Sequence, residues 1–85
     1  MHDLHLADKI LKQILDFAAQ KNLKRITGAK IKVGDILEHN EFINPENLAF
    51  NLAMLSKSTP ADSANFHIEK INRQGEYIIE EIEGE

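Results

Sequence analysis

The architecture of this chain depends on one alternating segment, Arg25-Ile26-Thr27-Gly28-Ala29-Lys30-Ile31-Lys32-Val33. Four positions at a spacing of two share one face of an extended chain, and small or lysine residues lie between them: Thr27, Ala29, Ile31 and Val33. Alternation with this period is typical of a strand with one buried face. We therefore expect a strand over residues 25–33, ended by Gly34 and Asp35.

Helical periodicity precedes this strand. Over residues 4–21 an apolar stripe follows three- and four-residue spacing, at Leu4, Ala7, Leu11, Ile14 and Ala18. Asp3 is the expected N-cap, and Asn22 can adopt the left-handed conformation that ends a helix. His5 lies in line with the polar residues, so we expect it to face water.

A second helix is expected from the start signal Asn44-Pro45-Glu46 to about Lys57. An N-cap, a proline at the first helical position and an acid in the first turn favour this start. Its core stripe is Leu48, Leu52 and Leu55, whereas Phe50 and Met54 lie on a different side. The helix is either wedged between other elements, which we expect, or presents an apolar patch to a partner.

Two further strands are expected over residues 64–71 and 76–82, joined as a hairpin by the turn Asn72-Arg73-Gln74-Gly75. Alternation in the last strand is irregular, because Tyr77 and Ile79 oppose Ile78 and Ile82. Either both faces of that strand are partly covered or the strand contains a bulge.

These elements predict one α+β domain over residues 1–85, in the order helix-strand-helix-strand-strand. The first two strands bracket a helix and should be parallel, joined by a right-handed crossover. The result is a small mixed three-stranded sheet with two helices on one face and a charged, open opposite face. Residues 35–43 are expected to form a polar connection that holds Glu38, His39 and Glu41.

Composition excludes several classes of function. The net charge is −4, whereas nucleic-acid-binding domains normally carry a basic face. The chain has no cysteine, which excludes disulfides, thiolate catalysis and cysteine-ligated zinc. No apolar run approaches a membrane span and no signal-peptide pattern is present, so we expect a cytoplasmic protein. Phosphate loops, metalloprotease motifs and nucleophile motifs are absent from the sequence, and we expect no enzymatic activity.

The amino terminus, Met1-His2-Asp3-Leu4-His5-Leu6-Ala7, is the candidate for metal chemistry. A primary amine, a backbone amide and the imidazole of a second-position histidine can close adjacent chelate rings around one ion. Nitrogen-rich tetragonal or square-planar ligand sets suit Ni(II) or Cu(II). Met1 should be retained, because its removal generally needs a small second residue. The simpler interpretation is a solvated terminal histidine beside a helix-capping aspartate.

The same seven residues resemble the opening of the HypA family, usually Met-His-Glu-Leu-Ser-Leu-Ala. HypA proteins are nickel metallochaperones for hydrogenase maturation and, in some organisms, for urease. Similar positions continue along the chain, at Ile31-Lys32-Val33-Gly34-Asp35, Pro45-Glu46-Asn47-Leu48-Ala49-Phe50, Ser58-Thr59 and Ala64-Asn65-Phe66-His67-Ile68-Glu69. The resemblance implies the fold of the family's nickel-binding domain. It also implies transient Ni(II) binding by Met1, His2 and Asp3, and two partners, a HypB-type GTPase and a hydrogenase large subunit.

Three departures from the family pattern matter. Asp3 replaces the usual glutamate, and His5 replaces the usual serine and adds a potential metal ligand. The third departure is the absence of a zinc ribbon. The family carries this ribbon, with paired Cys-x-x-Cys motifs, between the last two strands, where this chain has only the turn 72–75. We therefore expect no zinc, and functions that use the ribbon are in question.

Two functional hypotheses follow from this resemblance. The first is a nickel-binding accessory protein that resembles a metallochaperone and serves the maturation of a nickel enzyme such as [NiFe] hydrogenase. The second is a HypA-derived interaction module that carries no metal and binds partners through Phe50 and Met54 or through a sheet edge. An exposed strand edge also allows a homodimer. A small α/β domain with an incidental His2 is the remaining reading.

Overall fold

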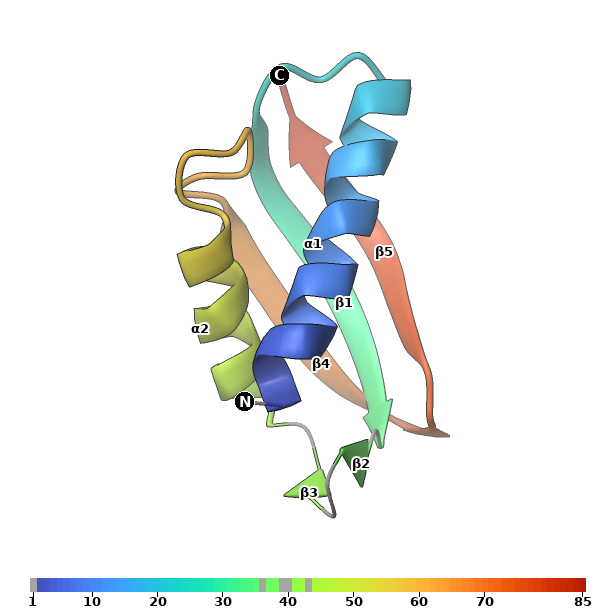
Figure 1. Ribbon diagram of the computed structural model, residues 1–85. Coiled ribbons are helices and arrows are strands. Elements are labelled where there is room, and N and C mark those ends of the chain that lie inside the picture. Colours follow the sequence, from blue (N-terminus) through green and yellow to red (C-terminus); the bar gives the residue numbers. More distant parts are fainter. Residues whose placement is uncertain (1, 36, 39–40, 43) are drawn as a thin grey trace.

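The computed structural model describes residues 2–35, 37–38, 41–42 and 44–85, with side chains described outside residues 2–5, 35–43 and 74. The elements are α1 (His2–Gln20), β1 (Ile26–Asp35), β2 (Leu37–Glu38), β3 (Glu41–Phe42), α2 (Pro45–Leu55), β4 (Asn65–Gln74) and β5 (Tyr77–Gly84) (Figure 1). The expected order of two helices and three principal strands is confirmed. The connection expected over residues 35–43 also contains the short β2–β3 ladder, in which Leu37 pairs with Phe42.

The principal sheet has the strand order β4-β1-β5, so β1 is the central strand. β1 and β4 are parallel, as expected for two strands that bracket a helix, and Ile31 pairs with Ile68. β5 runs antiparallel to β1, with Ile31 opposite Ile79. The predicted hairpin between the last two strands is therefore wrong, because β4 and β5 lie on opposite sides of β1 and each pairs with it (Figure 1).

The short link between β4 and β5 crosses the end of β1. On one side of β1 Asp35 pairs with Gln74, and on the other Val33 pairs with Tyr77. The Gly34 amide donates a hydrogen bond of 2.8 Å to the Glu76 carbonyl oxygen. A Cβ atom on Gly34 would lie 2.4 Å from the Arg73 carbonyl oxygen, so only glycine fits under this link. Gly75 supplies the expected positive φ, at 71°.

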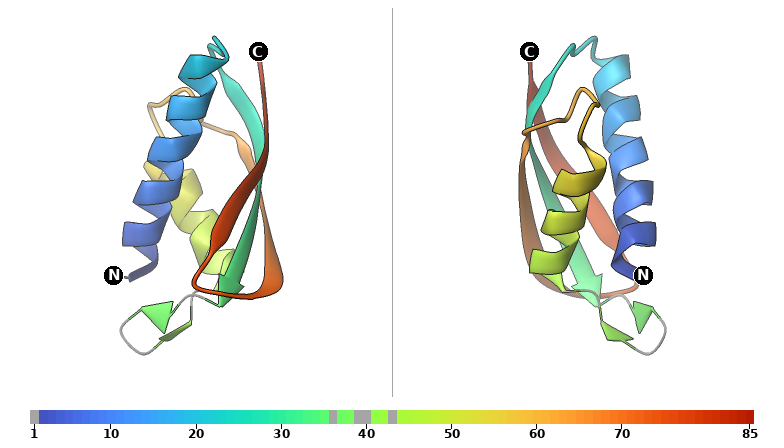
Figure 2. Two further views of the ribbon diagram at one scale, coloured as in Figure 1. Left: turned by 90° about the vertical axis from the view of Figure 1, so that its right-hand side faces the viewer. Right: turned by 60° about the vertical axis from the view of Figure 1, so that its left-hand side comes forward.

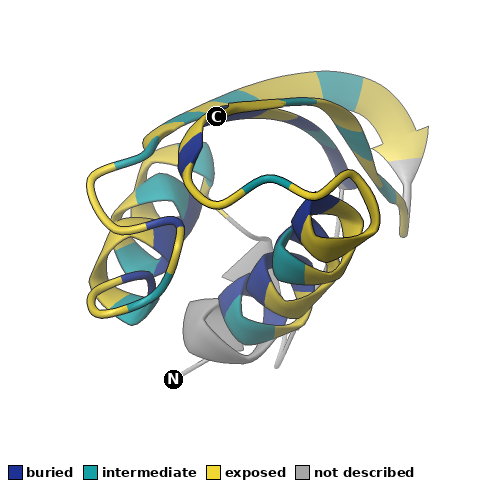
Figure 3. Cartoon of the chain, turned by 90° about the horizontal axis from the view of Figure 1, so that it is seen from above, coloured by how far each residue is buried: buried dark blue, intermediate teal, exposed yellow. Residues whose placement is uncertain are grey.

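Both helices cover one face of the sheet, as expected (Figure 2). Buried residues lie where the helices and the sheet face each other (Figure 3). The core is aliphatic, and its largest fully buried side chains are Ile10, Ile14, Ile26, Ile31, Val33, Leu48 and Leu52. Apolar area removed from water, at about 25 cal/mol per Å², is the main source of stability in such a core.

The ends of the helices follow local chemistry. α1 begins at His2, so the expectation that Asp3 caps it from outside is wrong: the backbone of Asp3 is already helical. Asn22 ends the helix with φ 59°, as expected. The Asn44 Oδ1 atom caps α2 by accepting hydrogen bonds from the amides of Glu46 at 2.8 Å and Asn47 at 3.3 Å. α2 ends at Leu55, and the buried Ser56 Oγ donates to the Leu52 carbonyl oxygen at 2.6 Å.

The expectation that α2 is wedged between other elements is confirmed only in part, because α2 packs against both α1 and β4 but is not enclosed. Leu48 and Leu52 are fully buried, but the Phe50 side is open, with exposures of 64% for Phe50 and 47% for Met54. Nothing in the described part of the chain covers the side of α2 that carries Phe50 and Met54. The second alternative, an exposed apolar patch, therefore also holds.

The irregular alternation of the last strand comes from a bulge. Lys30 pairs with Glu81 and Ile31 with Ile79, which leaves Glu80 as the extra residue of β5. An extra residue shifts the alternation by one position. Tyr77, Ile79 and Ile82 therefore all pack against the core, although their spacing is not a simple period of two.

We predict that Gly34→Ala destabilises the domain by about 1–3 kcal/mol, because its methyl group would overlap the backbone at Arg73. Gly28→Ala is the matched control in the same strand, since its Cβ atom would meet the nearest atom at an ordinary 3.5 Å. We expect the control to change stability by less than about 1 kcal/mol. Urea unfolding measures both variants. Equal stabilities would contradict the tight crossing at Gly34.

Candidate functional site

The amino-terminal candidate ligands fall in the first turn of α1. His2, Asp3 and His5 belong to the helix backbone, while their side chains, and Met1 altogether, lie outside the described residues. The first four amides of any helix have no intrahelical acceptor. The backbone amides of His2 and Asp3 are therefore free of the helix's own hydrogen-bond ladder.

The body of α1 holds this first turn against the domain. Leu6 is 5% exposed and Ala7 is fully buried, and Ile10 and Ile14 follow at helical spacing. On the solvent side an ion pair of 3.0 Å joins Lys12 to Asp8. Within the described side chains, the buried stripe thus starts at Leu6, directly after the candidate ligands.

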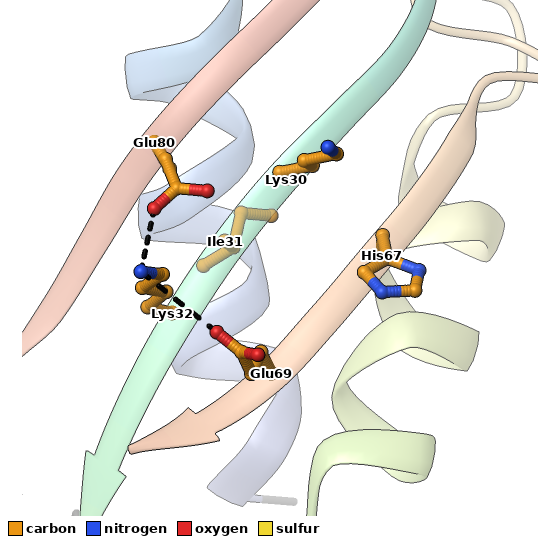
Figure 4. A pocket seen from close by; sticks show the side chains of 6 residues that line it. All are labelled: Lys30, Ile31, Lys32, His67, Glu69 and Glu80. Carbon is orange, nitrogen blue, oxygen red and sulfur yellow. Dashed lines mark ion pairs between the residues drawn. The ribbon is translucent and has the colours of Figure 1, made fainter.

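A second group of polar side chains lies on the open face of the sheet, which the helices do not cover (Figure 4). Lys30 and Lys32 lie on the central strand, Lys32 between acidic residues of both neighbouring strands and Lys30 beside an acidic residue of β5. The Lys32 Nζ atom lies 2.7 Å from a Glu80 carboxylate oxygen and 3.9 Å from one of Glu69. Lys30 lies 3.5 Å from Glu81. The two ammonium groups at the centre disfavour a metal cation here.

His67 borders this cluster from β4, where it pairs in register with Lys30. It is exposed, in agreement with the expectation that it lies on the polar face. Within the described residues, no three histidine, cysteine, aspartate or glutamate side chains are placed to hold a metal ion together. His39, expected in the polar connection, lies outside the described residues.

Two pKa shifts arise where β5 bulges. The hydrogen bond to Glu80, followed by the charge of that carboxylate, raises the pKa of Lys32. Reciprocally, the hydrogen bond from Lys32 lowers the pKa of Glu80 below its usual 4.5, with a weaker contribution from the charge of Lys30. Burial raises the pKa of Tyr77, whose hydroxyl donates to the Gln13 Oε1 atom at 2.9 Å and ties β5 to α1.

Sequence reasoning did not identify the Lys32–Glu80 pair. Only the irregular alternation over residues 76–82 pointed to a bulge, and it did not say which lysine the bulged residue meets.

Neither helix in the described part of the chain is both long and apolar enough to span a membrane.

We predict that the Glu80 carboxyl group titrates below 4.5 and that Lys32→Met returns it toward that value. Lys30→Met should have a smaller effect, because Lys30 acts only through its charge. Since the folded-state pKa is lowered, the stabilisation is present above the unfolded pKa and is lost as the pH falls through the folded value. Carboxyl-carbon NMR titration measures the shift, and equal effects of the two variants would contradict the hydrogen bond.

Comparison with known proteins places the chain in a family. Residues 1–76 match the family model "Hydrogenase/urease nickel incorporation, metallochaperone, hypA". A hydrogenase maturation factor HypA from Archaeoglobus fulgidus is 37% identical over 68 residues, covering 80% of this chain and 58% of the relative. One from Methanopyrus kandleri is 33% identical over 69 residues, covering 81% and 46%. One from Thermococcus sibiricus is 30% identical over 83 residues, covering 98% and 51%.

The chain thus spans about half the length of the curated relatives it matches. The family match takes in the amino-terminal motif, α1, the strand pair β1 and β4, and α2, and it stops just before β5. Its extent agrees with the resemblance seen in the motifs along the sequence. The chain belongs to the HypA family of hydrogenase and urease nickel-incorporation proteins.

Proposed function

We propose that this protein binds Ni(II) at its amino terminus and serves as a metallochaperone-like accessory protein in the maturation of a nickel enzyme such as [NiFe] hydrogenase. One observation carries the proposal: α1 begins at His2. Because the amides of a first helical turn have no intrahelical partner, a metal can use them without breaking a helix hydrogen bond. Family membership supplies nickel as the metal.

The proposed ligands are the Met1 amine, the His2 backbone amide and the His2 imidazole, with Asp3 as a further ligand through its backbone nitrogen or its carboxylate. His5, three residues beyond His2, is an additional imidazole that the usual family opening lacks. A nitrogen-rich set of this kind suits square-planar Ni(II). Nickel is the transient cargo in this proposal, and no zinc is part of the domain.

Closing adjacent chelate rings takes the backbone of the first residues out of the helical conformation. The structure supports a low cost for this change. Leu6 and Ala7 are buried, and unwinding the chain up to Asp3 leaves these two core residues in place. Helix ends also fray readily by one or two residues. The site can therefore form while the rest of α1 stays packed.

The relatives' printed names describe hydrogenase maturation factors. We extend this role to the present chain as a non-catalytic, cytoplasmic accessory that works with a HypB-type GTPase and delivers nickel to a hydrogenase large subunit. We further propose that residues 1–85 form a single nickel-binding domain without a zinc ribbon. The tight link across Gly34 supports this, since only two residues, Gly75 and Glu76, lie between the end of β4 and the start of β5.

A nickel titration tests the leading proposal. Protein that begins at Met1 should bind one equivalent of Ni(II), with a square-planar d–d absorption band and heat measurable by calorimetry. His2→Ala, or a Gly-Ser extension before Met1, should abolish the band, because each removes a nitrogen ligand. His5→Ala shows whether that imidazole contributes. His67→Ala is the matched control, because this exposed histidine lies on the sheet and not at the amino terminus.

Absence of binding at micromolar nickel would reject the nickel-carrier function. Binding that survives both His2→Ala and the extension would reject the amino-terminal site.

Nickel affinity should rise with pH. Protons compete with the metal for the amine, the amide and the imidazole, so each displaced proton changes the apparent affinity by about tenfold per pH unit below its pKa. Calorimetric titrations between pH 6 and pH 8 in two buffers of different ionisation heat would measure the proton release. An affinity independent of pH would argue against amine and amide ligation.

The second candidate function is an interaction module, and the exposure of Phe50 and Met54 favours it. These side chains, four residues apart on α2, form an apolar patch that the described residues leave uncovered. The patch could serve the metallochaperone as well as a metal-free module. The nickel titration distinguishes these two functions.

We predict that Phe50→Ser with Met54→Ser weakens binding to a HypB-type GTPase at least tenfold and leaves urea unfolding nearly unchanged, because both side chains are already exposed. The paired substitution Lys57→Ser with Asp62→Ser, two exposed polar positions beyond the helix, is the control. Calorimetry with the purified GTPase measures the effect. Unchanged affinity would exclude the patch as the docking surface for this partner.

A further inference from the structure

The outward side of α2 carries a stripe of exposed residues opposite the core residues Leu48 and Leu52. The stripe has spacings of four, three and four, and its members are Glu46, Phe50, Ala53 and Lys57. This is the spacing of a seam along which one helix packs against another. Figure 1 shows α2 at the outer side of the helical layer, beside α1 and over β4. The stripe is therefore accessible to a further helix.

Lys57 extends the stripe although α2 ends at Leu55. Ser56 keeps helical backbone angles, with φ −78° and ψ −10°. The Lys57 amide donates a hydrogen bond of 3.4 Å to the Met54 carbonyl oxygen. The stripe thus runs from the first turn of α2 to just beyond its last turn.

The centre of the stripe is apolar, and its two ends carry opposite charges. Phe50 and the small Ala53 are both exposed in the centre, and the exposed Met54 flanks them. Glu46 lies at one end and Lys57 at the other, and neither forms an ion pair with any residue that the structure describes. Both charges are therefore free to pair with another molecule.

This pattern is complementary to itself when two copies of α2 pack antiparallel. A two-fold axis that passes between residues 51 and 52 sets Phe50 of one copy opposite Ala53 of the other. The same axis sets Glu46 opposite Lys57. Each pair occurs twice, because a two-fold axis repeats every contact. One register therefore gives both phenyl rings a small residue to pack on and gives all four charges a partner of opposite sign.

The end charges also select the direction of packing. A parallel pair with two-fold symmetry would set Glu46 beside Glu46 and Lys57 beside Lys57, and such like-charge contacts are unfavourable. It would also set the two phenyl rings against each other and leave Ala53 facing Ala53. The antiparallel arrangement avoids all of these contacts.

We propose that the outward stripe of α2 is the interface of a homodimer, in which this helix packs antiparallel against the same helix of a second copy. Phe50 of each copy packs on Ala53 of the other, and Glu46 pairs with Lys57 at both ends. The dimer does not depend on nickel. A partner that docks on the Phe50 and Met54 patch occupies the same surface, so it competes with the second copy.

The size of the contact makes this dimer weak. Standard protein interfaces bury about 800 Å² on each partner, whereas α2 offers only about three turns of one helix. Dimers should therefore form at high protein concentration, and the monomer predominates at the micromolar concentrations at which partner binding is measured.

Dilution of the whole 85-residue protein tests the proposal, with EDTA present to remove metal bridges between copies. Sedimentation equilibrium and amide NMR from micromolar to millimolar protein should show a monomer–dimer equilibrium, with shifts along residues 46–57. Isotope-filtered NOEs should join the Phe50 ring of one chain to the Ala53 methyl group of the other. Phe50→Ala should weaken dimerisation about tenfold, because it empties the centre of the contact. Phe17→Ala, at an exposed phenylalanine of α1, is the matched control and should have no effect.

Charge reversal tests the register. Glu46→Lys and Lys57→Glu should each weaken dimerisation about fivefold at low salt, because each sets like charges opposite one another at both ends. An equimolar mixture of the two variants should dimerise as well as the unaltered protein, since each end then joins a lysine to a glutamate again. Lys9→Glu, at an exposed lysine of α1, is the control for a single reversal and should change nothing.

A protein that stays monomeric at millimolar concentration would overturn the proposal. Dimerisation that Phe50→Ala leaves unchanged would assign the interface to another surface. A mixture that associates no better than either charge variant alone would reject the antiparallel register. Nickel binding should be identical in Phe50→Ala, so failure of the dimer leaves the nickel proposal untouched.

Discussion

The pairing of β1 on both of its edges is the constraint on which the rest of this domain depends. Ile31 and Val33 of β1 form the sheet side of the core, and Lys30 and Lys32 lie on the opposite face of the same strand. Because β4 and β5 both pair with this one strand, the chain must pass from one side of β1 to the other. It does so directly over Gly34, where a side chain would overlap the Arg73 backbone.

Local periodicity was sufficient to predict the principal elements. The apolar stripe of α1, the Asn44-Pro45 start of α2 and the alternation in β1 each depend on neighbours a few residues away. Strand order has a different origin. The turn residues around Gly75 suit a hairpin and a link across a third strand equally well, and the contact between Gly34 and Glu76, 42 positions apart in the sequence, decides between them. Such a contact leaves no local pattern.

The candidate site, like the fold, could be predicted from the sequence only in part. The amino-terminal motif could be identified from residue types alone, whereas the residue pattern favoured Asp3 as a cap and did not predict that α1 already begins at His2. The exposure of Phe50 depended on whether a further element would cover α2. Phe17 of α1 and Ile82 of β5 line one groove. The only local sequence feature that pointed to this region was the irregular alternation of the last strand.

The packing of α1 keeps its two ends independent. Between the first turn and Phe17, the fully buried Ile10 and Ile14 fix the helix against the sheet and α2. The Tyr77 hydroxyl, bonded to Gln13, holds the helix to β5 on the same stretch. A local change at His2 can therefore reach the far end of α1 only by moving these buried residues, which their close packing opposes. The nickel binding proposed for the first turn should thus leave the far end of α1 unchanged, without allosteric coupling between the two ends.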